Sequence, residues 1–363
     1  MREILDELER WRAAGHRIAT ARVVGVDGSA PRDPGAAMAV NDAGEVAGSV
    51  SGGCVEGAVV EEATAVLTGA HASGVVSFGY SDDDAFAVGL TCGGTVHVFV
   101  SLLDDSPYIE LRDALRADEP VVLASVTEGI HVGAELLVGP GRAPVGTLGD
   151  ADLDRVVARD ALGELEAGLT SLRHYGPHGE AREREVTVFV ESFALAPRML
   201  VFGAVDFTGA LVRVAKLLGF HVTVCDARAV FATAQRFPQA DEIVNDWPDR
   251  HLAKVGDELG PRDAVCVLTH DAKFDVPAIL AALETDVGYL GAMGSRRTHA
   301  DRVARLREAG VADDALERVM APIGLDIGAR TPQETAVSIC AEIIARRTGR
   351  GGPSLRDASG PIH

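Results

Sequence analysis

Lysine, basic charge and long apolar runs are all scarce in this chain of 363 residues. Its lysines are Lys216, Lys254 and Lys273, and its formal net charge is −20, which argues against nonspecific binding to nucleic acid or to an anionic membrane surface. No apolar run approaches the roughly 20 residues that a membrane-spanning helix needs, and residues 1–4 do not begin a signal peptide. We therefore expect a cytoplasmic protein.

Closely spaced cysteine pairs are also missing. The cysteines are odd in number and widely separated, and none forms a CxxC pair, so the sequence indicates neither a disulfide framework nor a zinc site. Any special cysteine should be a reactive thiol or a contact to a soft metal. The five are Cys54, Cys92, Cys225, Cys266 and Cys340.

The composition and the hydrophobic pattern predict an α/β protein with two domains. Hydrophobic residues make up 47% of the chain and charged residues 24%, as in a globular protein, and the length is too great for one ordinary core. Residues 1–195 mix helical and strand patterns without a linker, which predicts an N-terminal mixed α/β domain. In residues 196–348, apolar strands alternate with helices, which predicts a Rossmann-like doubly wound parallel sheet. Residues 349–363 are predicted to be a disordered tail.

A glycine-rich loop that ends on Cys54 stands directly before a predicted helix. After Ser51, Gly52, Gly53 and Cys54, apolar residues recur at helical spacing over residues 55–67. The thiol is therefore expected near a helix N-terminus, where free N–H groups and the helix dipole favour an anionic ligand or a thiolate. The alternative is that Cys54 is only a small residue in a tight turn.

A second cysteine, Cys92, is followed by Gly93 and Gly94 within the same predicted domain. Glycine lets a ligand approach the backbone because no Cβ obstructs it. Cys92 and Gly93 are therefore a second candidate for ligand contact, with the same structural alternative as Cys54.

The predicted Rossmann domain carries an altered dinucleotide fingerprint. Gly203, Val205 and Thr208 occupy the three glycine positions of GxGxxG. Because Val205 replaces the glycine that lets a pyrophosphate reach the backbone, we do not expect NAD(P) to bind tightly. Asp226 ends the next predicted strand, where such domains place a ribose-binding carboxylate, although it could equally cap a turn.

Two later loops are candidates for anion or ligand binding. One leads from a predicted strand into a predicted helix and could use backbone N–H groups and a cationic side chain. Its candidate residues are Gly291, Gly294, Ser295 and Arg296. In the other loop Asp326 is a candidate, whereas Thr331, Pro332 and Glu334 predict a helix N-cap and capping box.

Five ordered segments resemble the signature segments of the XdhC/CoxI family, and the resemblance covers about residues 2–347. They are Gly28-Ser-Ala-Pro-Arg32, Gly52-Gly-Cys54-Val-Glu56, Cys92-Gly-Gly94, Gly291-Ala-Met-Gly-Ser-Arg-Arg297 and Pro322-Ile-Gly-Leu-Asp-Ile-Gly328. Members of this family are accessory proteins of molybdenum hydroxylases such as xanthine dehydrogenase and carbon monoxide dehydrogenase. The resemblance implies a chaperone, rather than an enzyme, that binds molybdenum cofactor (molybdopterin), protects it during maturation and delivers it to the apoenzyme.

The resemblance and the loops together give a set of expectations. Cys54, with Cys92, is expected to contact the molybdenum or its sulfur, and the glycine loops are expected to hold the pterin phosphate. The partners would be an apo molybdenum hydroxylase and a cofactor sulfurase, and we expect a homodimer. The chain departs from the family at Gly203-Ala-Val-Asp206, where members more usually carry a GAGH-type run. The alternatives are an NAD(P)-dependent oxidoreductase built on the second domain and an interaction scaffold without a small molecule.

Overall fold

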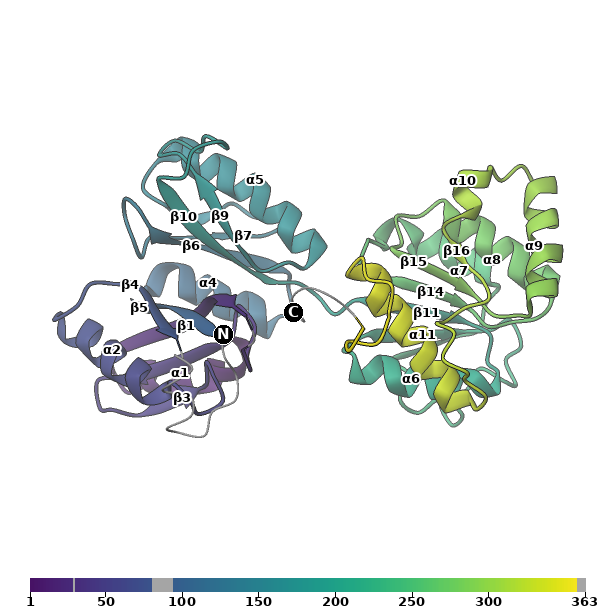
Figure 1. Ribbon diagram of the computed structural model, residues 1–363, viewed down its shortest axis with the longest axis horizontal. Coiled ribbons are helices and arrows are strands. Elements are labelled where there is room, and N and C mark those ends of the chain that lie inside the picture. The colour runs from purple at the N-terminus through teal and green to yellow at the C-terminus, as the bar shows by residue number, and fades with distance from the viewer. Residues whose placement is uncertain (29, 80–93, 358–363) are drawn as a thin grey trace. The chain divides into compact units, whose positions relative to one another are not determined.

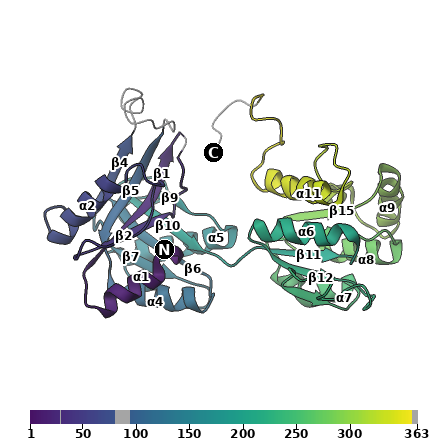
Figure 2. The ribbon, with the colours of Figure 1, turned by 90° about the horizontal axis from the view of Figure 1, so that it is seen from below.

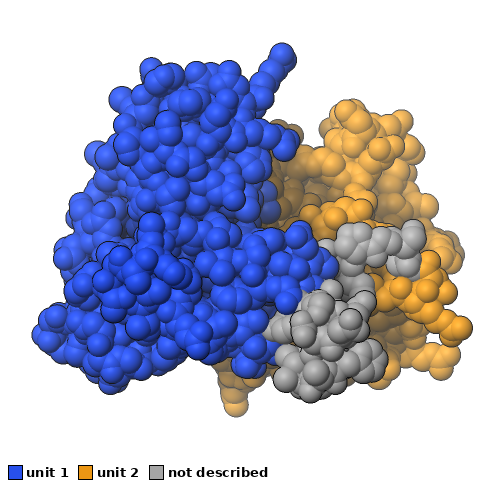
Figure 3. Space-filling model, turned by 60° about the vertical axis from the view of Figure 1, so that its left-hand side comes forward, with its two compact units in different colours: residues 1–195, 359–363 blue, residues 196–358 orange. Residues whose placement is uncertain are grey.

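The computed structural model describes residues 1–28, 30–79 and 94–357 and contains two compact units (Figure 1). The first unit is Met1–Leu195 and the second begins at Ala196; Figure 3 colours them separately. Cys92 and Gly93, two of the predicted contact residues, lie outside the described residues.

The first unit consists of two antiparallel sheets of five strands each. The first sheet has the order β3-β2-β1-β5-β4, with β1 (Ile18–Asp27), β2 (Ala37–Asn41), β3 (Val46–Gly48), β4 (Gly74–Gly79) and β5 (Thr95–Leu102). The second has the order β8-β7-β6-β10-β9, with β6 (Val121–Glu128), β7 (Glu135–Val138), β8 (Val145–Gly146), β9 (Ser171–Tyr175) and β10 (Val186–Phe193). Strands β2 and β3 form an antiparallel hairpin directly before the Cys54 loop.

Helices cover both sheets of the first unit because each helix buries one apolar stripe. Helix α2 (Glu56–Thr68) lies on the first sheet and α5 (Ala151–Ala167) on the second (Figures 1 and 2). Side chains of α1 (Leu5–Ala13) and α4 (Asp105–Arg116) share a third cluster with residues of both sheets. Between the sheets, the buried Arg22 donates to Glu135, Ser125 and Glu191. Its positive charge is therefore paired with carboxylates in the interior of the unit.

The two sheets of the first unit are an internal repeat. Each is built in the chain order strand, strand, strand, helix, strand, strand, and each has the same spatial order. Gly48 and Gly146, which end the third strands, lie 98 residues apart and both have positive φ. A Cβ on Gly48 would lie 2.3 Å from the oxygen of Ala37, and one on Gly146 would lie 2.2 Å from that of Glu135, again 98 residues apart. The equivalence therefore extends to single residues.

The second unit is a parallel six-stranded sheet of order β13-β12-β11-β14-β15-β16. Its strands are β11 (Arg198–Phe202), β12 (His221–Cys225), β13 (Glu242–Val244), β14 (Ala264–Val267), β15 (Tyr289–Ala292) and β16 (Val319–Met320). This is the strand order of a dinucleotide-binding Rossmann domain, and the predicted fold class is confirmed. The order reverses between β11 and β14, where such sheets bind ligands outside the carboxyl ends of the strands.

Both faces of this sheet are buried, which explains the near-continuous apolar strands. Met199 and Val201 belong to the cluster with α6 (Asp206–Leu217) and α11 (Pro332–Arg347). Leu200 and Phe202 belong to the cluster with α7 (Pro248–Val255) and α8 (Ala272–Leu283), and Figure 2 shows these helix pairs on opposite sides of the sheet. The remaining helices of the described residues are α9 (Arg296–Glu308), α10 (Asp313–Leu316) and the short 3-10 turns η1 (Arg2–Ile4) and η2 (Gly256–Glu258).

Helix α11 begins as predicted. Thr331 accepts from the backbone of Glu334, whose side chain accepts from the backbone of Thr331, and Pro332 is the first helical residue. None of the helices in the described ranges is long and apolar enough to cross a membrane.

Candidate functional site

The loop before α2, residues 49–55, folds around the carboxylate of Glu56, the first residue of the helix. The Ser49 hydroxyl donates to Oε1 at 2.6 Å, and the backbone N–H groups of Ser51 and Gly52 donate to the same oxygen at 2.9 and 3.0 Å. The N–H of Gly53 donates to Oε2 at 2.9 Å. Burial raises the pKa of Glu56, but the hydrogen bonds from Ser49 and Ser51 outweigh it and lower the pKa to about 2. We call this arrangement the hydroxyl–acid clasp.

The clasp changes what the Cys54 loop can offer a ligand. The prediction that a helix starts directly after Cys54 is confirmed, because α2 begins at Glu56. The N–H groups of Ser51, Gly52 and Gly53, however, already donate to a carboxylate of the protein itself. The group left for a ligand is the half-buried thiol of Cys54, whose backbone N–H donates to the Ser51 hydroxyl at 2.9 Å.

The second repeat shares the hydroxyl–acid bond of the clasp but has no cysteine, and its helix α5 already begins at Ala151. Thr147 and Asp154 lie 98 residues after Ser49 and Glu56. The Thr147 hydroxyl donates to Oδ2 of Asp154 at 2.7 Å, and the N–H of Leu148 donates to Oδ1 at 2.7 Å. The residue equivalent to Cys54 is Asp152, which is exposed. The fold therefore uses the hydroxyl–acid bond twice, whereas the thiol and the N–H groups of residues 51–53 around the carboxylate are particular to the first repeat.

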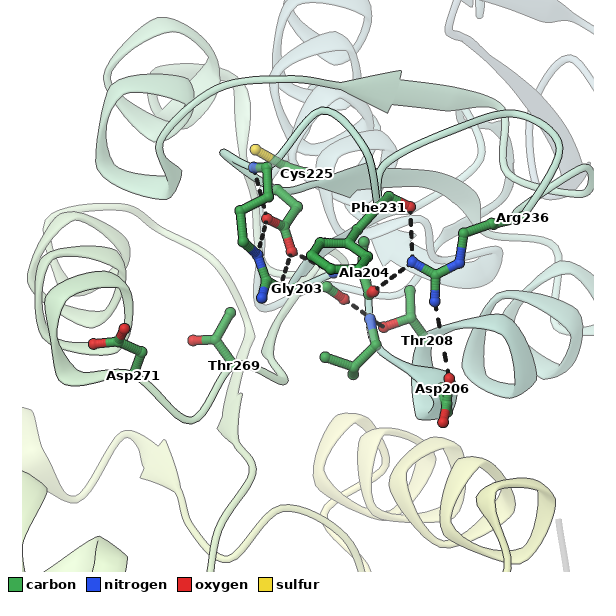
Figure 4. Close-up of polar contacts among 12 residues, drawn as sticks. Gly203, Ala204, Asp206, Thr208, Cys225, Phe231, Arg236, Thr269 and Asp271 are labelled. Atoms are coloured by element: carbon green, nitrogen blue, oxygen red, sulfur yellow. Dashed lines mark hydrogen bonds and ion pairs between the residues drawn. The ribbon is translucent and has the colours of Figure 1, made fainter.

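In the second unit, the nucleotide loop (residues 203–208) is also bonded within the protein (Figure 4). The Ala204 N–H donates to Oδ2 of Asp226 at 2.8 Å, and the Arg228 guanidinium donates to both oxygens of the same carboxylate at 2.8 and 2.9 Å. Burial raises the pKa of Asp226, but the hydrogen bonds from Arg228 and Ala204 outweigh it and lower the pKa. Asp226 therefore fastens the nucleotide loop to the end of β12.

Three further hydrogen bonds hold this loop closed. The Thr208 hydroxyl donates to the Gly203 carbonyl, and the Val205 N–H lies 3.4 Å from the Thr208 oxygen. Arg236 donates to the Ala204 carbonyl at 3.1 Å and points toward Asp206 in Figure 4. Since the loop's polar groups are engaged by the protein, few are free for a pyrophosphate.

Gly203 has a packing reason to be glycine. Its φ is +115°, and a Cβ there would lie 2.9 Å from Cγ2 of Thr269, which follows β14. At the point where the strand order reverses, the ends of β11 and β14 can lie this close only because residue 203 has no side chain.

A cavity of about 690 Å³ opens beside the nucleotide loop, at the carboxyl ends of β11 and β14. Val205 and Arg228 line one side, and residues 269–276, between β14 and the first turns of α8, form its floor. The other wall belongs to α9 and consists of Thr298, Asp301, Arg302 and Arg305, which we call the α9 wall. A cavity at this place is where the fold predicts a ligand.

A buried ion pair lies at the base of the α9 wall. Nη2 of Arg302 donates to Asp275 and to the Met293 carbonyl, both at 2.8 Å, and the Thr269 hydroxyl donates to the other oxygen of Asp275. Arg302 and Asp275 are 4% and 3% exposed, yet Nη1 of Arg302 has no hydrogen-bond partner within the described part of the chain. A buried guanidinium nitrogen without a partner is costly and indicates that something else can pair with it.

Of the predicted residues of the Gly291 loop, Gly294 and Ser295 lie between a strand and a helix as expected, and Gly291 does not. The prediction that Gly291 lies in a turn is wrong, because it is buried in β15, and a Cβ there would lie 2.5 Å from Ile323. Gly294 follows the strand, and the Ser295 hydroxyl accepts from the Thr298 N–H at 3.1 Å as the cap of α9. Arg296 and Asp326 are exposed and do not line the cavity.

The cavity residues Thr269, Asp275, Arg302 and Arg305 were missed by sequence reasoning. They lie on segments predicted only as strands and helices, and no local motif marks them. The clasp did carry a signal, since a Gly-Ser or Gly-Thr pair is followed by an acid seven residues after the hydroxyl in both repeats. Among the described residues, no three His, Cys, Asp or Glu side chains are grouped as a metal ion would require.

The chain matches family models over most of its length. A model of the XdhC and CoxI family matches residues 11–79 and 114–176, and a model of the XdhC Rossmann domain matches residues 199–343. The protein therefore belongs to the XdhC and CoxI family.

Its relatives include a probable xanthine dehydrogenase subunit of Bacillus subtilis (strain 168), 29% identical over 331 residues that cover 90% of this chain and 92% of that protein. The molybdenum cofactor insertion chaperone PaoD of Escherichia coli (strain K12) is 25% identical over 325 residues, 90% of this chain and 82% of PaoD. A crystal structure of a xanthine dehydrogenase from Bacillus halodurans is similar with a TM-score of 0.65 and 25% identity, covering 96% of this chain and 97% of that one.

Proposed function

We propose that this protein binds molybdenum cofactor, protects it and delivers it to an apo molybdenum hydroxylase of the xanthine dehydrogenase type. The observation that carries the proposal is the similarity to an insertion chaperone over 90% of this chain, which includes both units. On this proposal the chain is a maturation factor and not an enzyme. Carbon monoxide dehydrogenase is a second client class, and a cofactor sulfurase and a second copy of the chain are further partners, all in the cytoplasm.

The Cys54 thiol is the proposed contact to the molybdenum or its sulfur. Thiolates are soft ligands that suit such a centre. The second repeat supports this role, because it forms the hydroxyl–acid bond with Asp152 at the position that corresponds by number to Cys54, so the bond itself needs no cysteine. Ser51, Gly52 and Gly53 form the frame around the thiol, and Cys92 and Gly93 are proposed as a second contact.

The cavity of the second unit is the proposed site for the pterin and its phosphate. Its volume of about 690 Å³ lies in the range of small-molecule sites. Arg228, Lys273 and Arg302 line it in ion pairs with carboxylates, whereas Arg305 makes no ion pair with a described residue and can balance an anionic ligand. The predicted contacts Gly203 and Asp226 border this cavity through the nucleotide loop, and Gly294 and Ser295 precede its α9 wall.

The test is cofactor retention by protein purified from cells that synthesise molybdenum cofactor. We expect the full-length protein to carry molybdenum, measured by mass spectrometry, and to release a fluorescent pterin derivative on oxidation. Cys54→Ser should lower the retained molybdenum by about tenfold, the size expected for one lost charge-assisted contact. Asp152→Ser, at the equivalent position of the second repeat, is the matched control and should retain as much as the parent protein.

Equal retention by the parent protein and Cys54→Ser would remove the thiol from the ligand set. Parent protein that carries neither molybdenum nor pterin would reject the proposed function as a whole. The oxidoreductase alternative predicts micromolar affinity for NAD, NADP or a reduced form in calorimetric titration. The internally bonded nucleotide loop gives no support to that alternative.

A further inference from the structure

In the nucleotide loop, two of the backbone N–H groups that could bind a phosphate are already engaged by the protein. In Rossmann domains the loop after the first strand and the start of the following helix present N–H groups to a pyrophosphate. Here the Ala204 N–H donates to Asp226, and the Val205 N–H faces the Thr208 hydroxyl. The cation nearest to this loop, Arg228, is itself held by Asp226 at 2.8 Å. The positive charge of Arg228 on this side of the cavity is therefore already neutralised by Asp226.

The opposite side of the cavity has unused positive charge. Arg302 uses Nη2 for Asp275 and Met293, but its buried Nη1 has no partner among the described residues. Arg305, one turn further along α9, is exposed, lines the same cavity and makes no side-chain hydrogen bond or ion pair with any described residue. Lys273 lies 3.0 Å from Asp271 and Arg302 lies 2.8 Å from Asp275, so Arg305 on the α9 wall is the cavity cation that no described carboxylate pairs, and Nη1 of Arg302 is a free donor beside it.

The backbone above Arg302 leaves room for a ligand. Gly294 has a φ of +149°, and a Cβ there would lie 3.2 Å from Thr298 and 3.7 Å from Nη2 of Arg302. A larger residue at this position would cover the guanidinium and the first turn of α9. The Thr298 hydroxyl lies 2.9 Å from the Ser295 hydroxyl at the same helix start, so hydroxyl donors border the cations.

From these contacts we propose that the phosphate of the bound cofactor lies against the α9 wall, held by Arg302 and Arg305, and not in the glycine loop after β11. This deepens the proposed function and rests on it for the identity of the ligand. The site takes a phosphate monoester or pyrophosphate through two guanidinium groups one turn apart. Asp301, which lines the same wall, weakens the site by repulsion.

The first experiment uses inorganic pyrophosphate as the probe and the full-length protein in calorimetric titration. Arg305→Ala should weaken pyrophosphate binding by about tenfold, because one charge-assisted hydrogen bond is lost. Asp301→Asn should strengthen binding by about threefold, because a like charge is removed from the wall. Arg296→Ala is the matched control, since Arg296 is an exposed arginine of the same helix that does not line the cavity.

Arg305→Ala is the primary variant because Arg302→Met leaves the buried Asp275 unpaired and can unfold the unit. Unchanged binding by Arg305→Ala, or an equal loss by Arg296→Ala, would overturn the α9 wall as the phosphate site. An opposite response of Asp301→Asn would do the same.

A second experiment separates this inference from the proposed function. The oxidised, fluorescent pterin derivative is titrated into the protein with its phosphate and after phosphatase treatment. We expect the phosphate to strengthen binding to the parent protein by about tenfold and this gain to be lost in Arg305→Ala. Equal binding of both forms rejects the phosphate site and leaves the function standing. Pyrophosphate binding with the expected variant pattern, but no pterin binding, supports the site and rejects the function.

Discussion

Glu56 is the residue whose role the structure changed most. A glutamate at the first position of a helix is ordinarily a modest favourable charge near the dipole. Here its carboxylate fills the loop that precedes it and accepts hydrogen bonds from Ser49, Ser51, Gly52 and Gly53. The anion that the glycine-rich loop binds is thus part of the chain, and Asp154 repeats the hydroxyl–acid bond of this arrangement in the second repeat.

Replacing Glu56 by Gln should destabilise the first unit by about 1–3 kcal/mol, because an amide nitrogen cannot accept the N–H groups that the carboxylate accepts. Unfolding in urea, followed by Trp11 fluorescence in a Trp247→Phe background, measures this change. Glu61→Gln, an exposed glutamate on the same helix, should change the free energy of unfolding by less than about 0.5 kcal/mol. Equal midpoints for the two variants would contradict the clasp.

The same carboxylate gives the first unit a pH dependence of known sign. The pKa of Glu56 is about 2 in the folded protein against 4.5 for a free glutamate, so its contribution is complete above pH 4.5. The contribution is lost as the pH falls from about 5 toward 2. The difference in free energy of unfolding between the parent protein and Glu56→Gln should therefore shrink over this range. A difference that stays constant down to about pH 2 would show that the carboxylate is not held as described.

At the scale of elements, β15 and α6 each contain a residue whose environment is set by packing and not by the local sequence pattern. Gly291 lies inside β15 because Ile323 and Tyr289 fill the space that its side chain would occupy. Leu217, the last residue of α6, is 86% exposed, because this helix buries Thr208, Leu211, Val212 and Ala215 instead. The sequence pattern identified both elements, but it did not predict the burial of Gly291 or the exposure of Leu217.

Gly291→Ala should destabilise the second unit by about 1–3 kcal/mol, because a Cβ would lie 2.5 Å from Ile323. The matched control is Gly209→Ala within α6, where the nearest atom is 4.0 Å away, and this variant should be neutral or stabilising by up to about 1 kcal/mol. Thermal unfolding followed by circular dichroism measures both. A loss of stability in Gly209→Ala as large as in Gly291→Ala would disprove the packing account.

At the scale of the whole molecule, the two units have separate cores. The clusters of the second unit contain only its own residues, on either face of its parallel sheet, and those of the first unit contain only residues before position 195. Each unit thus buries enough apolar surface to fold without the other.

A fragment of residues 196–357 should therefore fold alone and unfold cooperatively in urea, measured by far-ultraviolet circular dichroism. A fragment of residues 196–286, which lacks β15, β16 and α11, is the control and should remain unfolded because the sheet and one helical layer are incomplete. If residues 196–357 show no cooperative transition, the second unit depends on the first for its stability.

Much of the architecture follows from local pattern. Apolar strands such as residues 198–202, separated by helices, predicted the parallel sheet, because a strand buried on both faces must be apolar at every position. The turn and cap chemistry of Thr331, Pro332 and Glu334 predicted the start of α11. The internal repeat was missed, since its two halves share only a glycine, a hydroxyl and an acid at equal spacing.

The sequence by itself determined the fold class, the helix that follows Cys54 and the single thiol at its start, because each depends on residues close together in the chain. Only the tertiary structure decided that Glu56 fills the Cys54 loop, that Asp226 fastens the nucleotide loop, and that Arg302 keeps a buried nitrogen without a partner among the described residues. The physical reason is that these three facts depend on which side chains meet at the ends of helices and strands. Asp275 and Arg302 are brought together by two helices packed beside one sheet, and no local spacing encodes that contact.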